Sequence, residues 1–221
     1  MIKKKLSFKE TEHFYIWETD NDVFLSSKNK IEDIDTLKEL TGIEKFYYTD
    51  QIHSEKITII DKDIFEYSNS DGLISFNELK YPLLIRTADC MPVFISSSKV
   101  KALLHAGRKG VELNIFNTFL DLIRNKQIKK TEILFFFGPH ICRDCYEINR
   151  ETRETFPLFK KAKDYLISSG LDEKQIINSE ICSLENKELF SYRRNNTKKR
   201  IYNLLIPKDL YRKYRQKNQL F

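Results

Sequence analysis

Apolar residues fall in short runs along the chain, separated by polar or charged segments. Two runs near the middle, residues 83–85 and 100–104, are nearly continuous rather than alternating. Continuous apolar runs of this length are typical of strands that are buried on both faces. Pro92 and Gly107 then turn the chain shortly after these runs. The pattern therefore predicts two central buried strands, each ending close to polar side chains.

Further strands are predicted by the same criteria. Aromatic and β-branched residues at 14–17 and 23–25 flank a polar segment, which is the spacing of a β-hairpin. An apolar run at 133–137 is stopped by Gly138-Pro139 and predicts another buried strand. The remaining predicted strands are 45–49, 56–60, one that begins at 71–75, 176–182, 189–194 and 200–206.

Helical periodicity occurs in segments that are spread along the chain. Over residues 31–40 the apolar positions lie on one face, and Gly42 follows the last turn as a cap. Residues 116–123 place four large apolar side chains on one stripe, so this helix is expected to pack against a sheet. The other predicted helices are 152–167, which Pro157 divides into two pieces, and 208–216.

The order of these elements predicts the fold class. Strands outnumber helices, and the helices are dispersed among them, so we expect a mixed α/β (α+β) fold in which helices cover sheet faces. No Gly/Ser-rich or Pro-rich linker interrupts the 221 residues. A chain of this length can bury one substantial core, so residues 1–221 are expected to form a single compact domain.

Composition narrows the class of protein. The charged start and the absence of long apolar runs argue against a signal peptide or a membrane span, so we expect a cytoplasmic protein. Four unevenly placed cysteines do not form a disulfide framework and are interpreted as thiols. The net charge of +6 comes from scattered lysines and arginines. The basic C-terminal third is therefore interpreted as solvated surface rather than a nucleic-acid site.

Three residues with metal-binding side chains follow predicted strands. Cys90 and His105 come after the two central apolar runs, and His53 comes after the strand predicted at 45–49. Two imidazoles and one thiolate suit Zn²⁺, and three protein ligands leave a fourth position for water or substrate. This indicates a catalytic zinc site. The spacing alone leaves open the alternative that the cysteine and the histidines are packing residues.

Charged residues near these positions suggest anion binding. A helix is expected to begin just after His105, where Lys109 and free backbone N–H groups could share a phosphate. Arg193 could bind phosphate through its planar fork. Asp89 directly precedes Cys90, and it is either a catalytic carboxylate or one that caps the backbone.

A second cysteine pair offers a rival metal site. Cys142 and Cys145 form a C-x-x-C motif with His140 nearby, but a structural zinc needs four ligands, and only Cys182 or His13 remains to complete the set. The interpretation favoured from sequence is that the pair are small apolar residues in a turn.

Several motifs resemble a known family. They occur in the family's order and span residues from about 51 to 206. The stretches are Gln51-Ile52-His53-Ser54, Asp71-Gly72-Leu73-Ile74, Thr87-Ala88-Asp89-Cys90-Met91-Pro92-Val93, His105-Ala106-Gly107, Gly138-Pro139-His140-Ile141, Cys145-Tyr146-Glu147-Ile148 and Phe190-Ser191-Tyr192-Arg193-Arg194. They are similar to the YfiH-like proteins, also called the multicopper polyphenol oxidase or laccase-domain family, which are understood as purine nucleoside phosphorylases.

The resemblance implies a YfiH-like fold of layered mixed sheets and a zinc ion held by His53, Cys90 and His105. It implies phosphorolysis of adenosine, inosine and methylthioadenosine to free base and ribose 1-phosphate, with a side activity of adenosine deaminase in which zinc activates water. For this chemistry we nominate Asp89, Cys90 and His105 as catalytic residues, and Lys109 and Arg193 as residues that bind substrate, because phosphorolysis needs cations around phosphate and a group that helps the base leave. Purine nucleosides and phosphate are the expected partners, without nucleic acid or membrane.

The chain departs from the family pattern in two places. The family reads His-Ala-Gly-Trp-Arg-Gly, whereas this chain has Arg108 and Lys109 in place of Trp-Arg. Lysine keeps the charge but lacks the planar fork, so the affinity for phosphate is expected to differ. Members also carry a glycine-rich stretch near the N-terminus, and here the first glycine is Gly42. Sequence does not determine the preferred nucleoside, the acid for the leaving base or the oligomeric state.

Three rival functions stay open. A metal-free cysteine hydrolase would use Cys90 as nucleophile and His105 as base. A copper-dependent polyphenol oxidase would need more imidazoles than the four histidines of the chain supply for a multicopper cluster, which argues against it. A non-catalytic basic binding module would bind nucleic acid with strong salt dependence.

Overall fold

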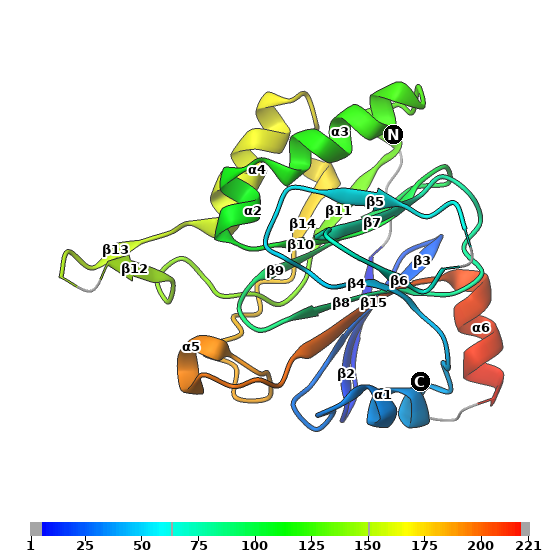
Figure 1. Ribbon diagram of the computed structural model, residues 1–221, viewed down its shortest axis with the longest axis horizontal. Coiled ribbons are helices and arrows are strands. Elements are labelled where there is room, and N and C mark those ends of the chain that lie inside the picture. The colour runs from blue at the N-terminus through cyan, green and yellow to red at the C-terminus, as the bar shows by residue number, and fades with distance from the viewer. Residues whose placement is uncertain (1–5, 63, 150, 218–221) are drawn as a thin grey trace.

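Two sheets form the centre of the structure, with helices on their outer faces (Figure 1). The computed structural model describes residues 6–62, 64–149 and 151–217. The first sheet has seven strands, in the spatial order β1 (Ser7–Glu10), β2 (Phe14–Glu18), β3 (Asp22–Ser27), β15 (Ile201–Pro207), β8 (Leu83–Thr87), β4 (Tyr47–Thr49) and β6 (Glu66–Tyr67).

The second sheet has six strands. Their order is β14 (Ile176–Asn178), β11 (Leu134–Phe137), β9 (Met91–Ser96), β10 (Lys101–Ala106), β7 (Gly72–Ser75) and β5 (Ile57–Ile59). Both sheets are mixed, because β4 is parallel to β8 and β6, and β11 is parallel to β14. A separate hairpin pairs β12 (Glu147–Asn149) with β13 (Glu154–Thr155). This arrangement confirms the predicted class of layered mixed sheets with helices.

Aromatic side chains fill the space between the two sheets. Phe24 on β3 stacks on Phe94 of β9, with ring centroids 5.0 Å apart, and on Phe136 of β11 at 5.4 Å. Neighbouring residues on the same strands point the other way: Val93 and Ile95 face the helices that cover the six-stranded sheet. Both faces of the central strands are therefore buried, which explains why their apolar runs are continuous.

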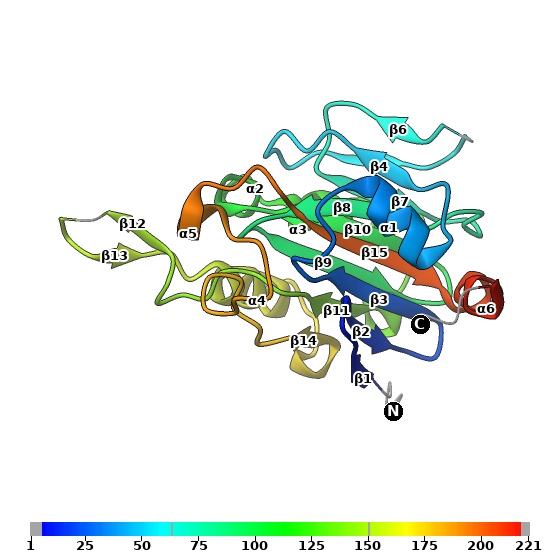
Figure 2. The ribbon, with the colours of Figure 1, turned by 90° about the horizontal axis from the view of Figure 1, so that it is seen from below.

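Helices cover the outer face of each sheet. The apolar stripe of α3 (Ile115–Asn125) and one face of α4 (Leu158–Ser168) pack on the six-stranded sheet, as predicted for residues 116–123. The seven-stranded sheet is covered by α1 (Ile34–Thr41) and α6 (Lys208–Lys217), which lie together on the other side of the molecule (Figures 1 and 2). Gly42 ends α1 in the left-handed conformation, with φ of 65°, as predicted.

The prediction of helix over 152–167 was wrong in its first part. β13 occupies part of that stretch, and α4 begins only after Pro157, which is its N-cap residue. The residue before a proline is disfavoured in helical conformation, so the helix could not extend back through Phe156. The proline thus marks the start of one helix rather than a break between two.

The strand predicted at 189–194 was wrong, because none of these residues lies in a strand. Residues Tyr192–Asn195 form a short helix, α5, because the Ser191 side chain accepts a hydrogen bond from the backbone N–H of Arg194. The strand predicted at 176–182 is limited to β14, and β9 was missed because Pro92 was interpreted as a turn. In the structure Pro92 lies within β9, opposite His105 of β10.

The remaining short elements are α2 (Arg108–Glu112) and two 3-10 turns, Lys130–Glu132 and Glu173–Gln175. Among the helices of the described ranges, none is long and apolar enough to cross a membrane. The cytoplasmic location stays a prediction.

Candidate metal centre and cavity

Three segments far apart in sequence, two connecting loops and one strand end, bring His53, Cys90 and His105 together. His53 lies in the loop after β4, Cys90 lies in the connection from β8 to β9, and His105 is the next-to-last residue of β10. The β8–β9 connection passes from one sheet to the other, so it carries Cys90 to the place where the two sheets meet. The strand-end positions seen in the sequence therefore converge.

The donor atoms of these residues lie close to one another. His53 Nε2 is 3.8 Å from Cys90 Sγ, and the His53 and His105 rings are 4.8 Å apart in an edge-to-face arrangement. The ligand atoms of all three lie within 4.8 Å of one another. His105 is buried, Cys90 is half-buried and His53 is exposed. One side of the group is therefore open to solvent.

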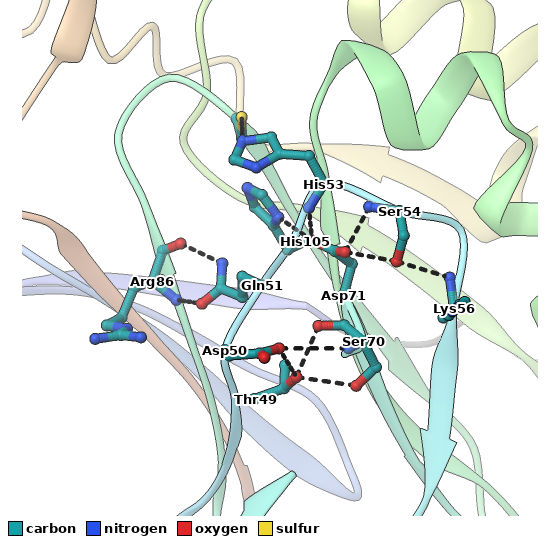
Figure 3. Close-up of polar contacts among 11 residues, drawn as sticks. Thr49, Asp50, Gln51, His53, Ser54, Lys56, Ser70, Asp71, Arg86 and His105 are labelled. Carbon is teal, nitrogen blue, oxygen red and sulfur yellow. Dashed lines mark hydrogen bonds and ion pairs between the residues drawn. The ribbon is translucent and has the colours of Figure 1, made fainter. Parts of the chain in front are cut away.

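The carboxylate of Asp71 contacts both His53 and His105 and fixes their positions (Figure 3). The carboxylate is fully buried, and its Oδ1 lies 2.8 Å from His105 Nδ1. The same carboxylate accepts the backbone N–H groups of His53 and Ser54 and the hydroxyl of Ser54. Nδ1 of His105 is thereby committed to Asp71, which leaves Nε2 as its metal-binding nitrogen. Pairing of a ligand histidine with a carboxylate is common around protein-bound metals.

The backbone around the group is held in an uncommon conformation. Gln51, His53 and Asp89 have φ values of 59°, 59° and 88°, in the region that favours glycine. Gln51 is fixed by two side-chain hydrogen bonds to the backbone of Arg86, of 2.6 and 2.7 Å. These contacts keep the His53 loop against the end of β8. Strained backbone is often concentrated at functional sites.

The electrostatics of the group favour a thiolate. Burial opposes ionisation of the Cys90 thiol, but the His105 and His53 imidazoles outweigh it and lower the pKa of Cys90 to about 6. Burial also opposes protonation of His105, yet the Cys90 sulfur and Asp71 raise the pKa of His105 to about 9. Burial would raise the pKa of Asp71, and hydrogen bonds from His105 and Ser54 hold it below its ordinary value.

The donor set fits a tetrahedral zinc ion. Bonds of about 2.0–2.3 Å to a tetrahedral centre place neighbouring ligand atoms about 3.3–3.8 Å apart, which is the His53–Cys90 separation seen here. A thiolate is the ionised form that zinc requires. His53, Cys90 and His105 are therefore possible metal ligands with a fourth position open.

Gly107 closes the group on another side. A Cβ at this position would lie 2.9 Å from Cys90 Sγ and 3.2 Å from a ring carbon of His53. Contacts below 3.0 Å force a neighbour to move, so a side chain at this position would push directly on two of the three donor residues.

A cavity of about 890 Å³ opens beside the group. Its size is within the range of small-molecule sites. The residues that line it come from the 50–53 loop, the end of β8 and its connection to β9, the end of β10, the β12 region and the segment 192–200. They are Asp50, Gln51, His53, Arg86, Thr87, Ala88, Asp89, Cys90, His105, Tyr146, Glu147, Ile148, Tyr192, Arg193, Asn196, Lys198 and Arg200.

Asp89 lines this cavity but already has partners. Its Oδ1 accepts the Ser183 hydroxyl at 2.7 Å, and its Oδ2 accepts the backbone N–H of Arg193 at 2.8 Å. The carboxylate thus anchors the start of α5, as in the backbone-capping alternative raised from sequence. Its catalytic role stays a prediction.

The two predicted substrate-binding cations are placed differently. Arg193 lines the cavity, and its guanidinium carbon lies 4.9 Å from the centre of the Tyr146 ring. Lys109 is exposed on α2 and is absent from the described residues that line the cavity. Its role in phosphate binding stays a prediction.

Sequence reasoning overlooked Asp71 and Tyr146 as site residues. Asp71 belongs to one of the motifs that carry the family resemblance. An acidic residue directly before a buried strand could have indicated a carboxylate that contacts the metal ligands. Tyr146 directly follows Cys145 in another such motif. Its contact with Arg193 depends on tertiary structure, since 47 positions of chain separate the two.

The sequence is similar to a known protein family and to enzymes of several bacteria. Residues 26–206 match the family described as "Multi-copper polyphenol oxidoreductase laccase". A protein of Campylobacter jejuni named purine nucleoside phosphorylase Cj1217c is 35% identical over 183 residues, covering 76% of this chain and 79% of its own. A purine nucleoside phosphorylase of Aquifex aeolicus is 30% identical over 183 residues, covering 76% and 86%.

A more distant relative carries a different name. Adenosine deaminase RL5, from an unknown prokaryotic organism, is 27% identical over 179 residues, which cover 65% of this chain and 68% of its own. Two solved structures share the fold. They are YlmD from Geobacillus stearothermophilus (TM-score 0.78, 17% identity, covering 92% and 99% of the two chains) and YfiH from Bacillus licheniformis (TM-score 0.74, 20% identity, covering 90% and 98%).

Proposed function

From the premise that this chain belongs to the multi-copper polyphenol oxidoreductase laccase family, we propose that it is a zinc-dependent purine nucleoside phosphorylase with a side activity of adenosine deaminase. Relatives that carry those two names support an enzyme of purine metabolism. The observation that carries the proposal is the position of His53, Cys90 and His105 on the wall of a cation-lined cavity of about 890 Å³.

The charges of the cavity favour an anionic substrate. The basic residues Arg86, Arg193, Lys198 and Arg200 line it together with the acidic residues Asp50, Asp89 and Glu147. Two of those three carboxylates are already engaged: Asp50 accepts the N–H groups of Asn69 and Ser70, and Asp89 accepts Ser183 and Arg193. Arg200 already donates to the carbonyls of Thr197 and Lys199, so Arg193, whose guanidinium lies over the Tyr146 ring, is the cation that we propose binds phosphate.

Aromatic side chains in the same cavity suit a purine. Tyr192 is 53% exposed and lines the cavity, so its ring face is open to stacking with a flat base. Tyr146 is held under Arg193 by a cation–π contact, and burial raises the pKa of Tyr146, so its hydroxyl stays protonated at neutral pH. The cavity thus offers an apolar surface beside a cationic one.

In the proposed reaction an oxygen of phosphate bonds to the ribose carbon that carries the base, and the bond from that carbon to the purine nitrogen breaks. The purine leaves with the bonding electron pair and takes up a proton, giving free base and ribose 1-phosphate. Arg193 and its neighbours would orient the phosphate and offset its charge. Bound zinc would supply a Lewis acid at His53, Cys90 and His105. Asp71 would hold His105 in one tautomer throughout.

The test combines metal analysis with product analysis. Purified protein and the Cys90→Ala variant are assayed for zinc and copper and for release of base from adenosine and inosine, with and without phosphate. We expect zinc in the wild type, its loss from this site in the variant, and ribose 1-phosphate only when phosphate is present. Base release that does not depend on phosphate would refute phosphorolysis, and full activity after removal of all metal would refute the zinc requirement.

A second candidate is favoured by one specific observation. Asp71, His105 and Cys90 are arranged as acid, base and nucleophile, with the pKa of Cys90 lowered and that of His105 raised. This arrangement is also that of a metal-free cysteine hydrolase. Such an enzyme would be fully active after treatment with a chelator and would be inactivated by alkylation of Cys90 in the metal-free state.

A further inference from the structure

A second group of metal-binding side chains lies away from the His53 site. It consists of Cys142, Cys145, Cys182 and Glu185, whose donor atoms all lie within 4.8 Å of one another. Cys182 is buried, Cys142 and Cys145 are half-buried, and Glu185 is exposed. The four residues come from two chain segments that are far apart in sequence.

Each segment supplies two donors from one tight turn. The backbone N–H of Tyr146 donates to the carbonyl of Cys142 at 3.1 Å, which closes the turn Cys142-Arg143-Asp144-Cys145. The N–H of Asn186 likewise donates to the carbonyl of Cys182 at 3.0 Å, closing Cys182-Ser183-Leu184-Glu185. In both turns the first and fourth residues carry the donors. This C-x-x-C spacing is the one that structural zinc sites use, here matched by C-x-x-E.

The backbone holds the two turns against each other. His140 forms a parallel bridge with Cys182: its N–H donates to Ile181, and its carbonyl accepts the N–H of Ser183. Across the gap, the N–H of Cys142 points to Cys182 Sγ at 3.4 Å, and Cys145 Sγ lies 3.4 Å from Glu185 Oε1. One contact thus joins donor atoms of the two turns, Cys145 Sγ and Glu185 Oε1, and the other holds the backbone of Cys142 against the Cys182 sulfur.

The histidines that sequence analysis offered for this motif are placed elsewhere. His140 is buried, and its Nδ1 lies 2.8 Å from the carbonyl of Gly138. His13 lies beside Glu12, with 3.9 Å between its Nε2 and Glu12 Oε2. Cys182, one of the two candidates from sequence, does supply a third sulfur, and the carboxylate of Glu185 is the donor that sequence analysis missed. Four donors in one place favour a metal site over the interpretation of the pair as packing residues in a turn.

We propose that Cys142, Cys145, Cys182 and Glu185 form a second site for a divalent metal ion of the zinc class, with a structural role. Three thiolates and one carboxylate complete a four-coordinate shell, which is the closed pattern of structural sites rather than the open pattern of the His53 site. Soft sulfur donors select zinc over magnesium or calcium. A disulfide would use only two of the sulfurs and leave the third thiol and Glu185 without a role.

The site would brace one wall of the cavity. Cys145 directly precedes Tyr146, Glu147 and Ile148, which line the cavity. Cys182 directly precedes Ser183, whose hydroxyl binds Asp89 beside Cys90. A metal that joins the two turns would fix both segments at once. Its loss is therefore expected to lower the melting temperature and raise KM while leaving the His53 site able to bind metal.

The experiment counts metal in full-length protein loaded with zinc alone. Cys145→Ser removes one donor of the proposed site, and Cys90→Ala removes one donor of the His53 site. We expect each variant to hold about half of the zinc that the wild type holds, and a protein with both changes to hold almost none. Glu185→Gln, which keeps the shape of the side chain, should weaken binding at the second site only.

Cobalt distinguishes the two sites by their sulfur content. Absorption from thiolate-to-cobalt charge transfer scales with the number of thiolate ligands, so Cys90→Ala loaded with Co²⁺ should absorb roughly three times as strongly per bound cobalt as Cys145→Ser. Equal zinc content in the wild type and Cys145→Ser would overturn the proposal. Cys90→Ala changes only the His53 site. If the zinc site of the proposed phosphorylase is wrong, Cys90→Ala would hold as much zinc as the wild type, whatever Cys145→Ser shows.

A measurement on the wild type covers the case in which Cys145→Ser does not fold. Thiols are alkylated at alkaline pH before and after removal of metal with a chelator, and the modified peptides are identified by mass spectrometry. The proposal expects Cys142 and Cys145 to be protected until the chelator is added. Equal labelling in both states, or a disulfide between two of the three cysteines in freshly purified metal-free protein, would overturn it.

Discussion

The carboxylate of Asp71 lies 2.8 Å from Nδ1 of His105, and it also accepts the backbone N–H of His53. One buried side chain therefore positions two of the three residues of the candidate metal centre. Asp71 directly precedes β7, which pairs with β10, so the contact is built into the six-stranded sheet.

Asp71→Asn tests this positioning role. The amide cannot accept a hydrogen bond with the same strength and can present its NH₂ group to His105, so the imidazole loses its preferred tautomer. We expect zinc affinity to fall roughly 10–100-fold, as measured by competition with a chromophoric chelator. Asp50→Asn is the matched control, because Asp50 also accepts backbone N–H groups, but its described hydrogen bonds are to Thr49, Asn69 and Ser70 and not to a metal-donor residue. Unchanged zinc affinity in Asp71→Asn would show that Asp71 does not position the metal ligands.

Gly107→Ala tests the close packing of the donor residues. The φ of Gly107 is −77°, which alanine adopts freely, so the only penalty is the clash of the new Cβ with Cys90 and His53. Overpacking of about 1–3 kcal/mol predicts a loss of zinc affinity of roughly 10–100-fold, measurable by the same competition.

Gly170→Ala provides the opposite control. No atom of the described residues lies within 4 Å of a Cβ at that position, but its φ is +90°. It should lower the free energy of unfolding by about 1–2 kcal/mol and leave zinc affinity unchanged. If both variants lost zinc equally, the effect would be one of general stability.

The pH dependence of Cys90 alkylation tests the thiolate in the metal-free protein. The pKa of Cys90 is lowered from 9.0 to about 6, so its rate of reaction with iodoacetamide should be half-maximal near pH 6. The pKa of Cys145 is raised, so Cys145 is an internal control that should react only at alkaline pH. Peptide mapping separates the two. A Cys90 profile with its midpoint near 9 would contradict the expected interaction with His105.

The same pair makes a prediction about stability. The shifted pKa of Cys90 adds to the free energy of unfolding fully above pH 9, and this addition is lost as the pH falls to about 6. The shifted pKa of His105 adds to it fully below pH 6.5, and this addition is lost as the pH rises to about 9. Between about 6.5 and 9 the folded and unfolded states hold the same number of protons on the pair. In this range the unfolding free energy of the metal-free protein, measured with urea, should therefore not change with pH on account of this pair. Without the thiol, Cys90→Ala should become less stable relative to wild type as the pH rises.

Arg193→Ala tests phosphate binding in the proposed reaction. Hydrogen bonds to a charged group are worth about 1.5–3 kcal/mol, so KM for phosphate should rise roughly 10–100-fold, with a smaller effect on KM for the nucleoside. Arg193→Lys should lie between, since it keeps the charge and loses the fork. Arg124→Ala is the matched control, because Arg124 is an exposed residue of α3 outside the residues that line the cavity. An equal rise for both substrates would assign Arg193 a structural role instead.

Phe94→Ala tests the core between the sheets. The ring is fully buried and packs on Phe24 and Phe136, so its removal should cost about 3–5 kcal/mol of unfolding free energy, measured with urea. Phe8, which is 54% exposed on the edge strand β1, is the control, and Phe8→Ala should cost less than about 1 kcal/mol. Similar costs at the two positions would mean that the two-sheet core is not what stabilises the fold.

The local sequence pattern was sufficient to predict secondary structure where one physical cause determined the conformation. The stripe of α3 and the continuous run of β11 were predictable because burial alone decides those residues, and Gly42 because a left-handed cap favours glycine. It failed where two causes competed. Pro92 was interpreted as a turn, yet it lies in β9. Ser191 capped a helix within an apparent strand.

For the candidate site, the sequence by itself determined which residue types were present: two histidines and a cysteine near strand ends, and a C-x-x-C pair. Only the tertiary structure decided which of them meet. Asp71 reaches His105 across 34 positions of chain, and Cys182 with Glu185 reaches Cys142 with Cys145 across 40. Such contacts depend on strand pairing and on the register of distant turns. Hydrophobic periodicity records only how each residue relates to its own element, so it carries no information about them.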